Sequence, residues 1–230
     1  MQKEEFDVNK KTKTVKTGKT TKTAKRKSVS EQINELLEKT THEELKQFIR
    51  EKVVKNAPFR DLFLSSFAQH NSDESKELYI KHVKSILRTS SDRHGFIDWS
   101  ASRLVGNAID NLLESAQKQI DNRNYKSVVF ICTAVMEQMV EAFQYADDSN
   151  GDIGGCIDSA YEMLYMIAQE QPAEGIRKQI IEYCFTAFDK QIYSGWDWHI
   201  GVLRIASLLL KTEEETERIF KQIDKAQRSD

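Results

Sequence analysis

Residues 98–120 read DWSASRLVGNAIDNLLESAQKQI and contain the longest regular apolar pattern of the chain. Its apolar residues recur at spacings of three and four over about six turns, which places them on one face of an α-helix. Asp98 suits the N-cap because its carboxylate can accept hydrogen bonds from the free N–H groups of the first turn. The stretch therefore predicts a long amphipathic helix. Its apolar residues are Leu104, Val105, Ala108, Ile109, Leu112, Leu113, Ala116 and Ile120.

The next stretch, residues 128–143, carries a wider apolar stripe, and this width predicts a helix that is covered on two sides. On either side of this central pair, capping boxes and prolines indicate further helix starts. The expected starts are Ser28-x-x-Glu31, Thr41-x-x-Glu44, Pro58, Asn71-x-x-Glu74, Pro172, Ser194-x-x-Asp197 and Thr212-x-x-Glu215.

These patterns predict an all-α chain of about ten helices joined by short links, which make consecutive helices antiparallel neighbours. The scarcity of glycine (9) and proline (2) also favours helix over a turn-rich β fold. From Asp98 onward the starts recur every ~20–26 residues, so a helix pair recurs at roughly the length of helix-turn-helix repeats. We therefore expect an irregular array of α-α repeats, a TPR-like solenoid, in one domain over residues 28–230. A compact helical bundle is the alternative.

The N-terminal residues 1–27 differ in composition from the rest. They hold ten Lys or Arg against Glu4, Glu5 and Asp7, a net charge of +7, whereas the remainder carries −9. A Lys/Thr-rich stretch with so little to bury predicts disorder. It also predicts weak, nonspecific binding to phosphate backbones, although a solubilising leader is an equally simple interpretation. The residues concerned are Lys10, Lys11, Lys13, Lys16, Lys19, Lys22, Lys25, Arg26 and Lys27.

Cysteine use and hydropathy indicate a cytoplasmic protein. No apolar run approaches the ~18–20 residues that span a bilayer, so we expect no membrane association. The N-terminus has no apolar segment of a secretory signal. Cys132, Cys156 and Cys184 are odd in number and widely spaced, which favours reduced thiols that pack as small hydrophobes.

Three short motifs carry a resemblance: GFIDW at 95–99, ADDSNGDIG at 146–154 and SGWDW at 194–198. In order and spacing they resemble the α-helical region that follows the SWIM zinc finger in bacterial SWIM zinc-finger proteins, over roughly Ser30 to Trp198. The resemblance implies a helical scaffold. The Cys-x-Cys and Cys-x-His pairs of the zinc finger are absent here, so the zinc and the DNA contacts of that family do not carry over.

Other motifs that suggest chemistry have simpler explanations. Asp148, Asn150 and Asp152 follow the start of a calcium loop, but Ile153 and Ser159 stand where that loop needs glycine and glutamate. A turn joining two helices is therefore expected. No two histidines have the i, i+4 spacing of a metal-binding helix, and all five are expected at the surface. Neither a nucleophile elbow nor a phosphate-binding glycine loop occurs. We expect no enzyme activity, no cofactor and no metal.

The tryptophans are the candidate partner-binding residues. Trp99, Trp196 and Trp198 lie at expected helix starts, where aromatic side chains can form a binding surface on an array or can pack as core. Since residues two apart face different ways on a helix, Trp196 or Trp198 should be partly exposed or lie at the interface with the next repeat. The sequence predicts a non-enzymatic scaffold that binds another protein. The alternative is a nucleic-acid-associated factor whose basic tail supplies affinity.

Overall fold

The computed structural model describes residues 27–70 and 74–227. They divide between two compact units, and the boundary between Gln47 and Phe48 falls inside one helix. The predicted boundary at residue 28 stays a prediction, because residues 1–26 lie outside the described part.

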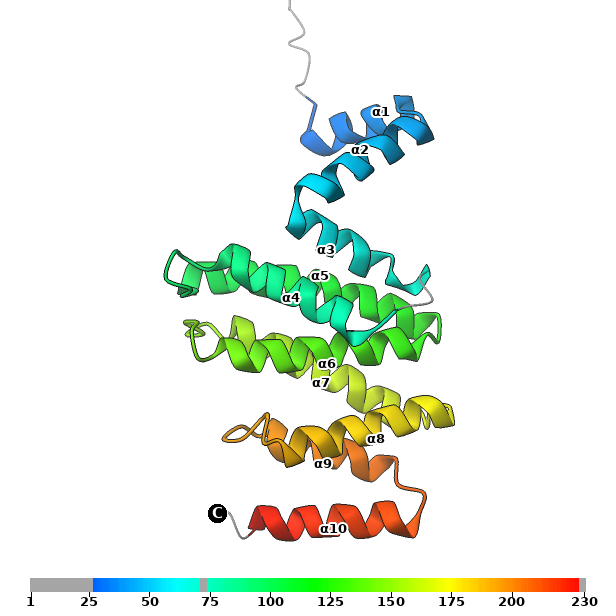
Figure 1. Cartoon of the computed structure of the whole chain (residues 1–230), viewed down its shortest axis with the longest axis vertical. Helices are drawn as coiled ribbons and strands as arrows, with labels where there is room; N and C mark the ends of the chain where they lie inside the picture. Colours follow the sequence, from blue (N-terminus) through cyan, green and yellow to red (C-terminus); the bar gives the residue numbers. More distant parts are fainter. Residues whose placement is uncertain (1–26, 71–73, 228–230) are drawn as a thin grey trace, which may run out of the picture. The chain divides into compact units, whose positions relative to one another are not determined.

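The described residues contain ten α-helices, one short 3-10 helix and no strand (Figure 1), so the all-α prediction is confirmed. None of these helices is long and apolar enough to cross a membrane. The elements are α1 (Val29–Lys39), α2 (His42–Lys55), α3 (Ala57–Ser66), η1 (Ala68–His70), α4 (Lys76–Ser90), α5 (Trp99–Asp121), α6 (Tyr125–Ala142), α7 (Asp152–Gln169), α8 (Glu174–Asp189), α9 (Trp198–Leu208) and α10 (Glu213–Gln227).

Several helices begin where local capping chemistry predicts. The Ser28 side chain accepts a hydrogen bond from the Glu31 amide, and the Glu31 carboxylate accepts one from the Ser28 amide, which completes the capping box of α1. Thr41 and Thr212 make the same reciprocal contacts at α2 and α10. The Asp98 carboxylate caps α5 by accepting from Ala101 N at 2.8 Å.

Other starts differ from the prediction. α8 begins two residues after Pro172, and α9 begins at Trp198 rather than after Ser194. The capping box expected at Asn71 falls on residues outside the described part, and α4 begins at Lys76. Asn56, which was not singled out, caps α3 through Phe59 N, and Pro58 follows it in the first turn.

In the larger unit, α3 packs mainly against α4, and each helix from α4 onward packs mainly against the next helix and the next but one. As a result α4, α6, α8 and α10 form one succession, and α5, α7 and α9 form the other. The pairs α4–α5, α6–α7 and α8–α9 follow one another in Figure 1. α6 is central to this packing, and its wide stripe is covered as predicted, with twelve of its residues buried.

One part of the predicted stripe is wrong. Leu104 of α5 is 63% exposed, while its neighbour Val105 is fully buried. The spacing of apolar residues identifies the apolar face of a helix. How much of that face is buried depends on the helices that pack against it. α6 and α7 cover the middle of the α5 stripe and leave its edge in solvent.

Arg177 of α8 attaches the last helix. Its side chain is 2% exposed, and it donates to the Leu209 carbonyl oxygen at 2.8 Å. It also pairs with Glu174 at 2.7 Å and Glu215 at 2.9 Å. These hydrogen bonds lower the pKa of Glu215 and bring that of Glu174 to about 2. A single guanidinium therefore joins α8, the end of α9 and the start of α10.

Candidate functional site

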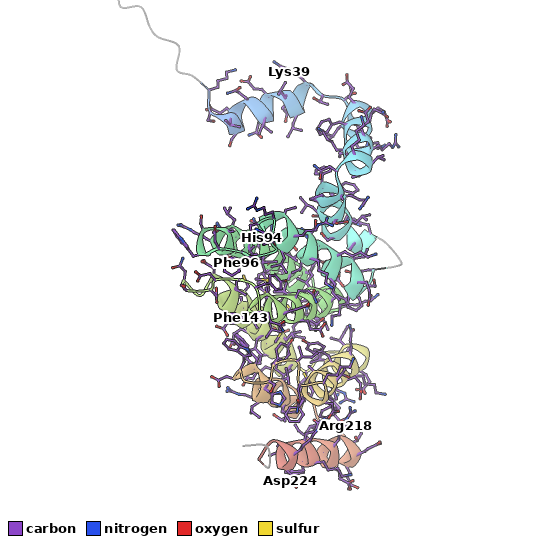
Figure 2. The ribbon with its side chains drawn as sticks, turned by 60° about the vertical axis from the view of Figure 1, so that its left-hand side comes forward. Lys39, His94, Phe96, Phe143, Arg218 and Asp224 are labelled. Carbon is purple, nitrogen blue, oxygen red and sulfur yellow. The ribbon has the colours of Figure 1, made fainter. Side chains whose placement is uncertain are left out.

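Three loops that follow alternate helices lie at one edge of the larger unit. They connect α4 to α5, α6 to α7 and α8 to α9, and they contain the three motifs singled out in the sequence. Figure 2 labels His94 and Phe96 of the first loop and Phe143 of the second at this edge. Each loop has one glycine at positive φ, a region that favours glycine. These glycines are Gly95 (85°), Gly151 (74°) and Gly195 (85°).

The first two loops are joined by backbone hydrogen bonds. Ile97 N donates to the Tyr145 carbonyl oxygen at 2.9 Å, and Asp147 N donates to the Ile97 carbonyl oxygen at 2.8 Å. The Ser102 hydroxyl donates to the Asp147 carbonyl oxygen at 2.7 Å. These contacts satisfy buried backbone groups and hold the α6–α7 loop in place.

Asp148 caps α7 from inside its loop. Its carboxylate accepts hydrogen bonds from Ile153 N at 2.6 Å and Gly154 N at 3.0 Å. Asp147 accepts from the backbone and hydroxyl of Ser149, which lowers the pKa of the Asp147 carboxyl. The acidic loop is thus a helix-joining turn, as the sequence predicted. Among the described residues no group of His, Cys, Asp and Glu side chains is arranged to hold a metal.

An aromatic cluster joins the second loop to the third. The Phe143 ring stacks on Trp196 with centroids 4.5 Å apart and lies 6.3 Å from Trp198, while the two indoles are 5.4 Å apart. The Trp198 indole N–H donates to Asp158 of α7 at 2.9 Å. Trp196 is 44% exposed. The indoles are therefore positioned by packing and one hydrogen bond, with one of them open to solvent.

The prediction that Trp196 and Trp198 face different ways on one helix is wrong, because only Trp198 is helical. α9 begins at Trp198, so Trp196 lies in the preceding loop, where its indole stacks on the Phe143 ring. The prediction that one of the two is exposed is confirmed. Trp99, the first residue of α5, is 58% exposed and is not part of this cluster.

Two cavities adjoin the aromatic cluster. One of about 680 Å³ is lined by Phe143, Ala146, Asp148, Gly151, Gly154, Gly155, Asp158, Trp196, Asp197 and Trp198. The other, of about 400 Å³, is lined by Asp158, Tyr161, Glu162, Asp197, Trp198, Ile200, Gly201 and Arg204. Both include Asp158, Asp197 and Trp198, so they form neighbouring parts of one surface. We call this the tryptophan surface.

Carboxylates dominate the charge of the tryptophan surface. Asp148, Asp158, Glu162 and Asp197 line it, against one cation, Arg204. The Arg204 guanidinium lies 5.1 Å from the centroid of the Tyr165 ring. An aromatic face beside several carboxylates attracts positive charge through the ring quadrupole and through Coulomb attraction. The chemistry available here is recognition of a cation.

The remaining sequence candidates divide into three groups. Lys10 to Arg26 lie outside the described residues, and Lys27 pairs with Glu35. The three cysteines are free and buried, and burial raises the pKa of all three thiols, that of Cys156 to about 12. His42, His70 and His94 are exposed as expected.

The prediction that all five histidines lie at the surface is wrong for two of them. His82 is only 7% exposed, because it lies on the face of α4 that packs against its neighbours. His199 is half-buried and stacks on Phe188 with centroids 4.4 Å apart. Desolvation lowers the pKa of both imidazoles.

Sequence reasoning missed most of the tryptophan surface. Phe143 ends an apolar stripe and therefore resembles an ordinary core residue, and Asp158 resembles a solvated helix position. The aromatic-Asp-aromatic pattern of Trp196–Trp198 was the available signal. It does not identify the partners of these indoles, which lie in the α6–α7 loop and on α7. Only packing brings these residues together.

No known protein family matches the chain, and neither a curated protein nor a solved structure does. The resemblance to the SWIM-associated helical region therefore stays a prediction that rests on three short motifs.

Proposed function

We propose that this protein is a non-enzymatic helical-repeat scaffold that binds a partner protein through the tryptophan surface. The partner contributes a segment rich in Lys or Arg. The observation that carries the proposal is the Phe143–Trp196–Trp198 cluster, which has an exposed indole and carboxylates on both sides.

The packing order supports the repeat architecture. Helices that pack mainly against the next and the next but one form a linear array, in which each repeat contacts its neighbours. α4, α6 and α8 begin at Lys76, Tyr125 and Glu174, which are equally spaced along the chain. The loops that follow these helices each contain a glycine at positive φ. A TPR-like array with an edge used for binding accounts for all three features.

The nature of the side chains supports binding rather than catalysis. Stacked aromatic rings lose little conformational entropy when a partner binds, and Trp is enriched among residues that dominate interface energies. The thiols are unsuited to nucleophilic attack because burial raises their pKa. A rigid aromatic anchor with an acidic border is a binding device.

Charge selects the class of partner. A Lys or Arg side chain can place its cation over the exposed face of Trp196 while its donors reach Asp158 or Asp197. An acidic segment would meet like charge and lose affinity. The proposal therefore commits to a basic peptide segment.

Short synthetic peptides test this proposal. We expect a Lys/Arg-rich peptide to change the intrinsic tryptophan fluorescence of the full-length protein saturably, and a Glu-rich peptide of the same length to have no effect. Trp196→Ala should weaken binding about 30-fold or more, as expected for an interface hot spot. Phe220→Ala is the matched control, because it removes another exposed aromatic ring, on α10, outside both cavities.

Equal affinity for the basic and acidic peptides would contradict the proposal, and so would an undiminished affinity of Trp196→Ala. Circular dichroism must show that each variant is folded. We expect this result because substitutions at exposed positions usually change stability little.

The alternative, a nucleic-acid-associated factor, rests on the net charge of +7 in residues 1–27. Its test is a salt titration of duplex DNA binding by the full chain and by a variant with the tail lysines replaced by glutamine. Tail-driven binding predicts a steep salt dependence that the variant loses. Absence of DNA binding at about 50 mM salt would exclude this alternative.

A further inference from the structure

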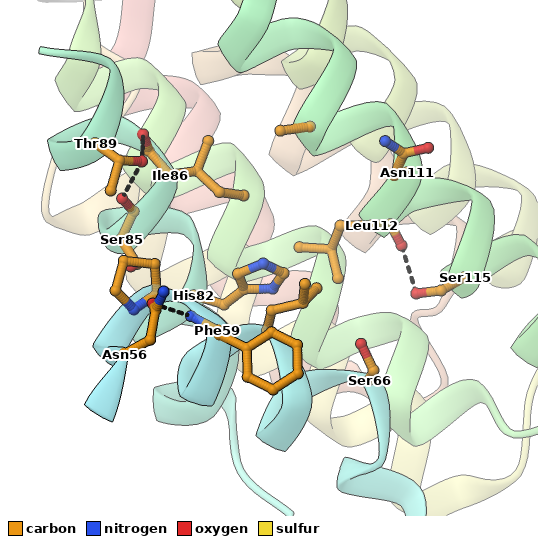
Figure 3. A pocket seen from close by; sticks show the side chains of 13 residues that line it. Asn56, Phe59, Ser66, His82, Ser85, Ile86, Thr89, Asn111, Leu112 and Ser115 are labelled. Atoms are coloured by element: carbon orange, nitrogen blue, oxygen red, sulfur yellow. Dashed lines mark hydrogen bonds between the residues drawn. The ribbon is translucent and has the colours of Figure 1, made fainter. Parts of the chain in front are cut away.

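A third cavity lies between α3, α4 and α5, remote in sequence from the residues of the tryptophan surface (Figure 3). Its volume of about 400 Å³ falls within the range of small-molecule sites. Its apolar part includes Phe59, Leu62, Ile86 and Leu112. No Asp, Glu, Lys or Arg lines it. A lining of this kind favours a neutral, partly apolar ligand over an ion.

His82 supplies a hydrogen-bond acceptor to this cavity. The Ser65 hydroxyl donates to the Leu62 carbonyl oxygen at 2.9 Å. The Oγ atom of Ser65 also lies 2.8 Å from His82 Nδ1. With the single hydroxyl hydrogen in the bond to Leu62, Nδ1 is the donor in the second contact. Burial lowers the pKa of His82 and so favours the neutral ring. Nε2 is then the unprotonated nitrogen of a side chain that lines the cavity.

Ser85 supplies a donor one turn further along α4. It also lines the cavity, is 4% exposed, and has no hydrogen-bond partner for its Oγ among the described residues. A buried hydroxyl without a partner is unfavourable. Residues three apart lie on the same face of a helix, so His82 and Ser85 present an acceptor and a donor side by side.

We propose that this cavity binds a small neutral molecule that carries a carboxamide on an apolar, preferably aromatic, body. The amide N–H donates to His82 Nε2, and the amide oxygen accepts from Ser85 Oγ after rotation about χ1. The apolar body contacts Phe59 and Leu112. Figure 3 draws the His82 imidazole among these two side chains.

Such a ligand would also strengthen the attachment of α3. This helix buries only Ser65, while Leu62 remains 45% exposed. A molecule in the cavity would cover Leu62 and contact α4 and α5 at the same time. Binding should therefore slow hydrogen exchange in α3 more than in α9, which does not line the cavity.

Benzamide is the probe for a first experiment on the full-length protein. Ligand-observed NMR should show saturable binding with a dissociation constant on the order of 1 mM, as expected for so small a molecule. N,N-Dimethylbenzamide keeps the ring and the carbonyl but lacks the N–H, so it should bind roughly tenfold more weakly. Benzoate should also bind more weakly, because no Lys or Arg lines the cavity.

Two substitutions on α5 locate the site. Ala108→Leu adds bulk at a lining position and should abolish benzamide binding without removing any hydrogen bond. Asn107→Leu makes a similar change at an exposed neighbour outside the cavity and should leave binding unchanged. Ser85→Ala should weaken benzamide roughly tenfold, and thermal unfolding reports whether each variant is folded.

The proposal is overturned if benzamide shows no saturable binding below about 20 mM, or if its N,N-dimethyl derivative binds as tightly. Both measurements use the unaltered protein. Undiminished binding by a folded Ala108→Leu variant would place the ligand elsewhere and also overturn it. These outcomes are independent of the peptide experiment on the tryptophan surface.

Discussion

α1 and α6 are both helices with clear apolar positions, yet they differ completely in burial. α6 buries twelve of its 18 residues, whereas α1 buries none of its 11. α1 has a complete capping box and an apolar side on which Ile33 and Leu36 are 50% and 64% exposed. α6 has no side-chain cap on its backbone N–H groups. In this pair of helices, the one with the complete capping box is the one that packs least.

This difference separates two sources of helix stability. Capping and favourable propensity contribute about 1 kcal/mol each and act within a few residues. Burial of large side chains contributes about 1.5–3 kcal/mol per residue but needs other helices to supply the opposing faces. α6 is stable because four helices cover it. The stability of α1 depends on the hydrogen bonds and the capping box within the helix itself.

The largest effect is expected from a matched pair of isoleucines. Ile131 of α6 is 2% exposed, and Ile33 of α1 is 50% exposed. Ile131→Ala should lower the free energy of unfolding by about 3 kcal/mol, since it leaves a cavity in the core. Ile33→Ala should change it by less than about 0.5 kcal/mol. Urea unfolding followed by circular dichroism measures both, and equal effects would contradict the division.

Arg177 tests how α10, another terminal helix, is attached. Arg177→Met should lower the free energy of unfolding by about 2–3 kcal/mol, because the Glu215 carboxylate and the Leu209 carbonyl lose their shared donor. Hydrogen exchange in α10 should rise at the same time. Arg218→Met is the control, since its ion pairs with Glu182 and Asp189 are exposed and contribute little. A similar loss in both variants would refute the special role of Arg177.

Acid should destabilise the packed unit through His82, which is buried, and His199, which is half-buried. The pKa values of His82 and His199 are lowered from 6.5 by desolvation, so the unfolded chain takes up protons that the native state resists. The free energy of unfolding should therefore fall as the pH drops below 6.5, by at most about 1.4 kcal/mol per pH unit for His82.

Urea midpoints at several pH values would show this effect. His82→Gln should reduce the slope between about pH 6.5 and 5. If the protein became more stable on acidification through this range, the desolvated histidines could not be the cause of acid destabilisation. The carboxylates of Glu174 and Glu215, whose pKa values are lowered, lose their contribution only below 4.5.

The smallest global effect is expected at the capping box of α1. Ser28→Ala removes the acceptor for the Glu31 amide and should cost α1 about 1 kcal/mol of local stability. The unfolding midpoint of the larger unit should not change. NMR chemical shifts of α1 report the local loss, and a cooperative shift of the whole unfolding transition would show that α1 is more than a locally stabilised helix.

Much of the fold was predictable from local chemistry. Ser28, Thr41, Asp98 and Thr212 cap helices where the sequence predicts, because a cap needs only residues within one turn. The wide stripe of α6 also predicted coverage on two sides. Leu104 and His82 were mispredicted because burial depends on which neighbouring helix reaches a given position.

The candidate sites were harder to predict than the helix starts, because their residues are far apart in the sequence. Trp196 and Trp198 were recognised as candidates, but Phe143 was not, since it lies more than fifty residues away along the chain. The cavity beneath His82 needs α3, α4 and α5 together. For neither group of residues does the spacing along the chain indicate that the side chains lie close together in the fold.

The amino-acid sequence by itself determined that the chain is helical, where several helices begin, and which faces are apolar, because these properties depend on hydrogen bonds and periodicity within a few residues. The tertiary structure alone decided that the loop tryptophans stack on Phe143 and that His82 and Ser85 line a cavity. Those contacts depend on which helix faces pack together, and a local pattern of residues contains no such information.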